Sequence, residues 1–145
     1  MESCLSKYNG HHMKLFVTAP FLGTQNKREI EELCALVHEA GFEDFCFVRD
    51  VEKYQHMFDD VHELMRRAKE EISKCDALLM DYDGPANGRM IELGIAFSLG
   101  KTIIVTTRRG TSVKDTVRGV ADVIIEYDKL ADIVKPLSEV VTPGA

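Results

Sequence analysis

Residues 75–101 read CDALLMDYDGPANGRMIELGIAFSLGK, and this stretch decides the fold. Its apolar run at 77–80 predicts a buried strand, and the loop that follows is rich in Asp, Gly, Pro and Asn. An amphipathic segment at 90–99 then predicts a helix that ends at Gly100. A short buried strand, a polar loop and a helix in that order are typical of one unit of a parallel sheet wrapped by helices.

The same alternation continues on both sides of this unit. Short apolar runs predict five strands, at 14–18, 44–48, 77–80, 102–106 and 123–126. Helical spacing of apolar residues predicts five helices, at 25–40, 59–73, 90–99, 113–120 and 128–141. The predicted fold class is therefore α/β: one three-layer domain over residues 13–145 with a five-stranded parallel sheet of flavodoxin-like (Rossmann-like) order. Residues 1–12 show no periodicity and are interpreted as a flexible N-terminal segment or a cloning remnant.

Composition excludes several classes of protein. With 145 residues, 45% of them hydrophobic and 29% charged, the chain has the length and composition of one soluble globular domain. Its 18 Lys and Arg against 24 Asp and Glu give a net charge of -6, which argues against binding a nucleic-acid polymer or an anionic membrane. No apolar run approaches the roughly 18 residues of a membrane-spanning helix.

The four cysteines lie far apart in the sequence, at Cys4, Cys34, Cys46 and Cys75. They lack the close pairs of a zinc site, and no secretory segment precedes them, so we expect reduced thiols in a cytoplasmic protein. The adjacent His11 and His12 are weak candidates for a metal site, and we expect no metal.

The predicted topology alone indicates where a ligand would bind, without reference to any motif. In open parallel sheets, ligands bind beyond the carboxyl ends of the strands, where the strand order reverses. Within that region Glu92 stands out, because it lies in the first turns of a helix that follows a Gly-containing loop. The positive end of the helix dipole is expected to keep its carboxylate ionised, and an ionised carboxylate beside a sugar can attack an anomeric carbon. The alternative is that Glu92 is simply a favourable residue near a helix start.

Residues 88–101 (GRMIELGIAFSLGK), after CDALLMDYDGPAN, resemble the core motif of the nucleoside 2-deoxyribosyltransferase family, and residues 14–21 (KLFVTAPF) resemble its first strand and substrate loop. The resemblance runs from about residue 14 to residue 127. It implies that Glu92 is the nucleophile that attacks the sugar C1′ and expels the base. It also implies that no cofactor is needed and that the protein is a homodimer or a higher homo-oligomer. Residues 116–127 (TVRGVADVIIEY) resemble the subgroup that hydrolyses 2′-deoxynucleoside 5′-phosphates.

Three positions depart from the family pattern. Phe16 stands where the family has a Tyr that hydrogen-bonds the nucleophile, Ala68 stands where it has an Asp, and Ala86 stands where it has a polar contact to sugar or phosphate. Neighbouring groups could have replaced them, either near Glu92 or on the second crossover, the candidates being Asp81, Asp83, Asn87, Arg89, Tyr54, His56 and His62. The other interpretation is a domain of this fold that binds a nucleotide without turning it over.

These considerations define the candidate site. The expected catalytic residues are Glu92, Asp81 and Asp83, and the expected substrate-binding residues are Phe16, Ala19, Phe21, Gly23, Asn87, Gly88 and Arg89. A basic group that is conspicuous in an acidic chain is expected to bind a 5′-phosphate, namely Arg108, Arg109, Lys114 and Arg118. In the hydrolase subgroup such a contact comes from a neighbouring subunit, and by that resemblance Lys114 takes the position of a Ser. A solvated, salt-screened loop is the alternative.

The predicted function is therefore cleavage of the N-glycosidic bond of a 2′-deoxynucleoside or its 5′-monophosphate through a covalent ester on Glu92. Resolution by a second base would make the protein a transferase, and resolution by water a hydrolase. A flavin-binding redox domain shares the sheet, but its phosphate loop would need a Ser/Thr-rich turn, and residues 21–29 (FLGTQNKRE) are a poor version of one.

Overall fold

A computed structural model describes residues 13–22, 26–55, 57–84 and 86–140. Five parallel strands form one sheet in the order β2-β1-β3-β4-β5. The strands are β1 (Lys14–Thr18), β2 (Glu43–Cys46), β3 (Ala77–Tyr82), β4 (Thr102–Arg108) and β5 (Val123–Tyr127). The α/β class and the flavodoxin-like strand order predicted from the sequence are confirmed. The interpretation of residues 1–12, with His11 and His12, concerns residues outside the described ranges.

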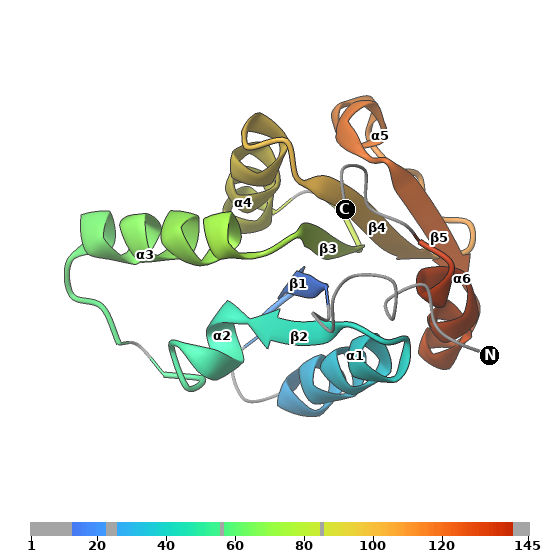
Figure 1. Cartoon of the computed structure of the whole chain (residues 1–145), viewed down its shortest axis with the longest axis horizontal. Helices are drawn as coiled ribbons and strands as arrows, with labels where there is room; N and C mark the ends of the chain where they lie inside the picture. Colours follow the sequence, from blue (N-terminus) through green and yellow to red (C-terminus); the bar gives the residue numbers. More distant parts are fainter. Residues whose placement is uncertain (1–12, 23–25, 56, 85, 141–145) are drawn as a thin grey trace.

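Helices cover both sides of the sheet, with α1 and α6 on one side and α4 and α5 on the other (Figure 1). They are α1 (Lys27–Glu39), α2 (Phe47–Asp50), α3 (Val61–Lys74), α4 (Asn87–Ser98), α5 (Asp115–Val120) and α6 (Val134–Ser138), the last preceded by a 3-10 turn (Leu130–Ile133). Because alternate residues of a strand face opposite sides, Leu15 and Val17 pack with α1 while Phe16 packs in the second core, with α3 and α4. Two apolar cores result, one on each side of the sheet.

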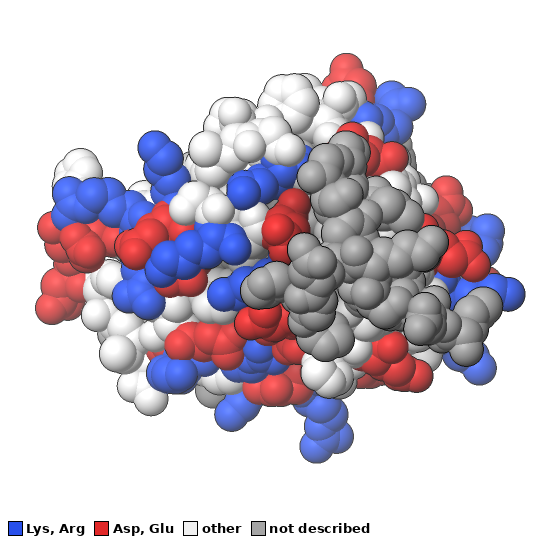
Figure 2. All heavy atoms as spheres, in the orientation of Figure 1, with Lys and Arg blue, Asp and Glu red and all other residues white. Residues whose placement is uncertain are grey.

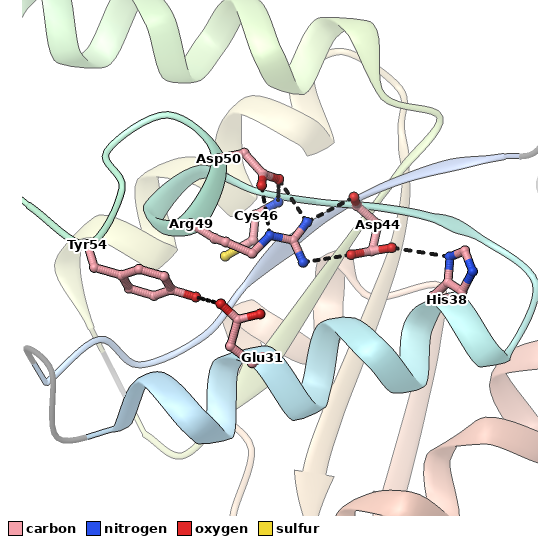
Figure 3. A network of polar contacts seen from close by, with 7 residues as sticks. All are labelled: Glu31, His38, Asp44, Cys46, Arg49, Asp50 and Tyr54. Atoms are coloured by element: carbon pink, nitrogen blue, oxygen red, sulfur yellow. Dashed lines mark hydrogen bonds and ion pairs between the residues drawn. The ribbon is translucent and has the colours of Figure 1, made fainter.

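The second strand is shorter than predicted. The apolar run at 44–48 predicts a single strand, but the strand ends at Cys46, and Phe47 begins the short helix α2. Arg49 pairs with both Asp44 (2.8 Å) and Asp50 (2.7 Å), and Asp50 accepts a hydrogen bond from the Cys46 N–H (2.9 Å), as Figure 3 shows. These charge-assisted bonds stabilise a sharp corner that an apolar pattern alone does not reveal.

The last helical segment of the structure also differs from the prediction. In place of one helix over 128–141, the structure has the 3-10 turn and then α6 of five residues. Pro136 explains part of the difference, because it has no N–H to donate and fits only the first turn of a helix. A continuous helix would have placed it in the interior.

The surface in Figure 2 carries acidic and basic side chains interspersed, including an alternation of sign along α3 at the left. Several of these charges on α3 pair with each other, as do Arg67 with Glu71 (3.0 Å) and Lys74 with Glu70 (3.3 Å). The described cysteines, Cys34, Cys46 and Cys75, are buried free thiols. Among the described residues, no helix is both long and apolar enough to cross a membrane.

Candidate active site

A pocket of about 570 Å³ opens at the carboxyl ends of β1 and β3. Its walls come from the segment after β1, from α2 and the residues that follow it, from one face of α3, from the loop after β3 and from the start of α4. In the sheet, β2 lies on one side of β1, and β3, β4 and β5 follow on the other side. The strand order therefore reverses between β1 and β3, which is where the pocket opens. The pocket therefore lies where the topology predicts a ligand site.

Glu92 lines this pocket from the second turn of α4. Its Oε1 accepts a hydrogen bond from the Thr18 hydroxyl at 3.1 Å. Burial raises the pKa of Glu92 to about 7, although the Thr18 hydrogen bond and the positive charge of Arg89 oppose that rise. The sequence analysis expected the helix dipole to keep this carboxylate ionised, but Glu92 lies in the second turn rather than the first, and burial raises its pKa instead.

Thr18 is a residue of the candidate site that the sequence analysis did not single out. It ends β1, it is buried, and it faces the same side of the sheet as Phe16 because the two are separated by one residue. Phe16 itself is fully buried, with its ring centroid 5.7 Å from that of Phe45. A hydroxyl two positions further along the strand therefore makes the contact that Phe16 cannot make. The period of two in a strand is the signal that could have found it.

A second carboxylate, Glu52, also lines the pocket, and its negative charge contributes to the raised pKa of Glu92. It precedes two residues in the left-handed region, Lys53 (φ 52°) and Tyr54 (φ 59°). The Tyr54 hydroxyl donates to Glu31 at 2.5 Å (Figure 3), which ties this turn to α1. Such backbone conformations are costly for residues other than glycine, and they persist where surrounding contacts enforce them. The turn after α2 thus holds Glu52 at the pocket.

Arg89 and Asp83 form an ion pair at the pocket wall, with Arg89 Nη2 at 2.8 Å from Asp83 Oδ1. Arg89 is only 8% exposed, whereas the Asp83 side chain is 60% exposed. Within the described part of the chain, Nε and Nη1 of Arg89 are buried and have no hydrogen-bond partner. The sequence reading placed both residues near Glu92, and the structure brings both to the same pocket.

Asp81 does not line the pocket. It accepts hydrogen bonds from the Thr106 hydroxyl (3.0 Å) and the Tyr127 hydroxyl (2.9 Å), and burial raises its pKa. Leu79, two positions before Asp81 and on the same face of β3, packs in the core on the α1 side. Met80, on the other face of β3, packs in the core on the α4 side. Strand alternation therefore directs Asp81 away from Glu92.

The predicted substrate-binding residues divide between the pocket and other places. Ala19, Phe21 and Gly88 line the pocket, whereas Asn87 is exposed and does not line it. Gly23 lies outside the described residues, as does His56 of the second crossover. Also on that crossover, His62 is an exposed residue at the start of α3.

Two of the positions that depart from the family pattern belong to the pocket wall. Ala68 contributes from α3, and Ala86 contributes from the residue before α4. Both place a methyl group where the resemblance implies a polar side chain. The part of the wall that α3 contributes is apolar, with Leu64 and Met65 lining the pocket together with Ala68.

The predicted phosphate-binding group lies away from the pocket. Arg109 pairs with Asp128 (3.1 Å) and Glu126 (3.8 Å), and Arg108 lies over the ring of Tyr127 at 5.8 Å from its centroid. Lys114 and Arg118 are exposed at the start and in the body of α5. None of the four lines the pocket, so any contact from them to a ligand there would have to come from a second subunit.

Comparison with known proteins supports the fold. No protein-family model matches the chain, and no curated protein matches it by sequence. Its structure is similar to that of the CMP N-glycosidase BcmB from Clostridium botulinum, with a TM-score of 0.62 and 23% identity over 86% of this chain and 97% of that one. It is also similar to a 2-deoxyribosyltransferase from Bacillus psychrosaccharolyticus, with a TM-score of 0.68 and 16% identity over 84% and 90% of the two chains. A conserved protein from Enterococcus faecalis V583 has a TM-score of 0.70 at 12% identity, over 88% of this chain and 98% of that chain. The chain thus shares the fold of N-glycosidase and deoxyribosyltransferase structures.

Proposed function

We propose that this protein cleaves the N-glycosidic bond of a 2′-deoxynucleoside or its 5′-monophosphate, with Glu92 as the nucleophile. The observation that carries the proposal is the Glu92 carboxylate, hydrogen-bonded to Thr18 inside a pocket at the reversal of strand order. The shared fold with an N-glycosidase and a deoxyribosyltransferase supports it. The pKa of Glu92, raised to about 7 by burial, leaves a sufficient ionised fraction at neutral pH and a more basic carboxylate than one in water.

The reaction follows from that geometry. The ionised Glu92 carboxylate forms a bond to the sugar C1′, and the electron pair of the N-glycosidic bond leaves with the base, which takes up a proton. Thr18 donates to one carboxylate oxygen and so holds the side chain in place for attack. The resulting glycosyl ester is then broken at C1′ by water, which gives a free sugar, or by a second base, which gives a new nucleoside. Two displacements retain the configuration at C1′.

Other pocket residues have supporting roles in this proposal. Ala19 and Phe21, after β1, and Gly88, at the start of α4, would contact the substrate. Asp83, rather than Asp81, is the aspartate that could contact it directly, because only Asp83 lines the pocket. Lys114 and its basic neighbours would reach a ligand only from a second subunit.

Assembly into a homodimer or a higher homo-oligomer is part of the same proposal. The family resemblance implies it, and large apolar side chains exposed to solvent on α4 and just after it support it. These are Ile91 (52% exposed), Phe97 (56%) and, just after the helix, Leu99 (41%). Light scattering coupled to size-exclusion chromatography tests the assembly, and a monomer at all concentrations would contradict it.

A domain that binds a nucleotide without cleaving it is the second candidate, favoured by Ala68 and Ala86 in the pocket wall. One experiment separates the two. The protein is incubated with a panel of deoxynucleosides, their 5′-monophosphates and CMP, with and without a second base, and released base is measured by chromatography. Glu92→Gln should remove base release while ligand binding persists. Glu32→Gln, a matched change of an exposed residue on α1, should retain it. Binding without release in the unmodified protein would favour the second candidate.

A further inference from the structure

Two buried thiols that the proposed reaction does not use lie in contact with each other beside the pocket. Cys34 belongs to α1 and Cys46 ends β2, and α1 packs directly against β2. Both side chains belong to the core on the α1 side of the sheet, and the Cys34 thiol donates a hydrogen bond to the Cys46 sulfur. Two sulfurs within hydrogen-bond reach need only a small approach to attain the S–S bond length of about 2.05 Å. The fold therefore brings two cysteines from different elements close to the separation of a disulfide.

Cys46 is the member of the pair whose surroundings favour the thiolate. Its sulfur accepts hydrogen bonds from the Cys34 thiol and from the backbone N–H groups of Arg49 and Val48, and the Arg49 guanidinium adds a positive charge nearby. These contacts lower the pKa of Cys46 below its ordinary value, although burial opposes them. Ion pairs with two carboxylates hold the Arg49 guanidinium in this place (Figure 3). The thiolate is the form of cysteine that attacks an oxidant, so Cys46 is the more reactive of the two.

The pocket gives a small oxidant a route to Cys46. Cys46 lines the pocket, whereas Cys34 is fully buried and does not line it. The third cysteine that the structure describes, Cys75, has different surroundings. It packs in the other core, it does not line the pocket, and burial raises its pKa to about 12. We therefore expect Cys75 to remain an unreactive thiol under conditions that oxidise Cys46.

We propose that Cys34 and Cys46 are a redox modification site, at which hydrogen peroxide that enters the pocket converts the two thiols into a reversible disulfide. In the first step the Cys46 thiolate attacks one peroxide oxygen, the O–O bond breaks, and the other oxygen leaves as hydroxide, which takes a proton from solvent. Cys46 is then a sulfenic acid. In the second step the Cys34 sulfur forms a bond to the Cys46 sulfur, the S–O bond breaks, and the hydroxyl leaves with the Cys34 proton as water. The two cysteines lose two electrons, and the peroxide gains them and becomes two molecules of water.

The surroundings of Cys34 suit the second step. In the reduced protein its hydrogen bond to Cys46 and its burial raise the pKa of Cys34, so it stays a thiol beside the Cys46 thiolate. A Cys46 sulfenic acid is uncharged, and the part of that rise that comes from the Cys46 charge is then removed. The disulfide would join the end of β2 to α1 and change the part of the pocket wall that Cys46 forms. The inference is independent of the proposed function, because it concerns these thiols and not the bond that Glu92 would attack.

The test treats the folded full chain with hydrogen peroxide, alkylates the remaining thiols after unfolding, and measures the mass of the product. We expect the loss of two hydrogen atoms and of two thiols that can be alkylated, and a dithiol reductant should restore both. Cleavage after glutamate separates Cys34 from Cys46 at Glu39 and Glu43, so their disulfide should join two peptides that are otherwise separate. Cys75→Ser is the matched control in the other core, and it should form the same disulfide at the same rate.

Variants of the pair separate the two roles. Cys34→Ser keeps a hydroxyl that can donate to Cys46, and its oxidation should stop at a sulfenic acid, which dimedone labels at Cys46. Cys46→Ser should form no disulfide, and its Cys34 should be oxidised more slowly, on the order of tenfold or more. Thermal melting checks that both variants are folded. The position of the disulfide in the unmodified chain decides the matter even if one of them does not fold.

Several results would overturn the inference. One is the retention of every thiol at a peroxide concentration that oxidises a small free thiol. Another is a disulfide that includes Cys4, which lies outside the described residues, or Cys75. A sulfenic acid that persists at Cys46 in the unmodified chain would show that Cys34 does not resolve it. Labelling of Cys34 in Cys46→Ser as fast as that of Cys46 in Cys34→Ser would assign the first step to the wrong sulfur.

Discussion

The Thr18 hydroxyl donates a hydrogen bond to Oε1 of Glu92 at 3.1 Å, across 74 positions of sequence. The contact joins the carboxyl end of β1 to the second turn of α4, and both residues line the pocket. A hydrogen bond to a carboxylate favours its ionised form, so it lowers a pKa that burial raises. In the proposed mechanism, Thr18 therefore positions the Glu92 carboxylate and favours its ionised form.

Replacing Thr18 with Val tests this relationship. The two side chains are similar in shape, so the fold should persist, but loss of the donor should raise the pKa of Glu92 above 7. Base release needs the ionised carboxylate, so the rising limb of the pH–rate profile should move to higher pH by on the order of one unit. Thr18→Ser should restore the original profile. A profile that does not move would show that the hydroxyl serves packing alone.

Glu52→Gln should have the opposite effect. The negative charge of Glu52 raises the pKa of Glu92, and its removal should therefore lower that pKa and move the rising limb to lower pH. Single-turnover pH–rate profiles would show a shift to lower pH for Glu52→Gln and a shift to higher pH for Thr18→Val. Glu32→Gln on α1 is the matched control and should leave the profile unchanged. If Glu52 also donates a proton to the leaving base, the maximal rate would fall at every pH, which a purely electrostatic role does not predict.

The stability of Glu92→Gln should depend on pH in a defined way. Folding raises the pKa of Glu92 from 4.5 to about 7, so the unfolded chain releases this proton at lower pH than the folded protein does. The stabilising contribution is fully present below pH 4.5 and is lost as pH rises through about 7. Glu92→Gln should therefore unfold with a free energy similar to the unmodified protein at pH 4 but higher at pH 8, by about 3 kcal/mol at most. Chemical denaturation at the two pH values measures this, and a variant less stable at pH 8 would contradict it.

Asp81 and Asp83 should differ in stability, although the sequence places both in one strand-end loop. Asp81 accepts hydrogen bonds from two hydroxyls and is largely buried, so Asp81→Asn introduces amide donors without evident acceptors and should cost about 1–2 kcal/mol of unfolding free energy. Asp83 is 60% exposed, and an asparagine there keeps an oxygen that can accept from Nη2 of Arg89, so Asp83→Asn should cost less unfolding free energy than Asp81→Asn. Thermal melts of the two variants compare them directly, and equal losses would contradict the difference in burial.

The sequence predicts the sheet well because its signals are local. The apolar run at 77–80 and the stop at Gly100 needed no information from other parts of the chain, and the flavodoxin-like order expected for five such units is the order observed. The corner at Phe47 was not predictable in the same way. It depends on Arg49 reaching Asp44 and Asp50, and charged contacts of this kind leave no periodic pattern.

Some residues of the candidate site were predicted from local sequence signals, and others, which depend on contacts between distant parts of the chain, were not. Glu92 was predicted from its motif, and Asp83 and Arg89 from their proximity to it in sequence, and all three line the pocket. Glu52 was missed because its relation to Glu92 exists only after folding, whereas Thr18 could have been found from the period of two along β1. The role expected for Asp81 took no account of strand alternation, which turns its carboxylate to Thr106 and Tyr127.

Gly88→Ala should make the protein more stable and less able to bind its ligand. Gly88 lies in the first turn of α4, and an added Cβ meets nothing within 4 Å, so alanine should gain about 0.5–1 kcal/mol from its higher helix propensity. The open space is the pocket, however, so the methyl group would occupy volume beside the helix start that the substrate would otherwise fill. Gly119→Ala in α5 is the matched control, since its Cβ is equally unobstructed and it lies outside the pocket. Melting temperatures should rise in both variants, while base release should fall only in Gly88→Ala. Unchanged base release in Gly88→Ala would mean that the substrate does not approach the start of α4.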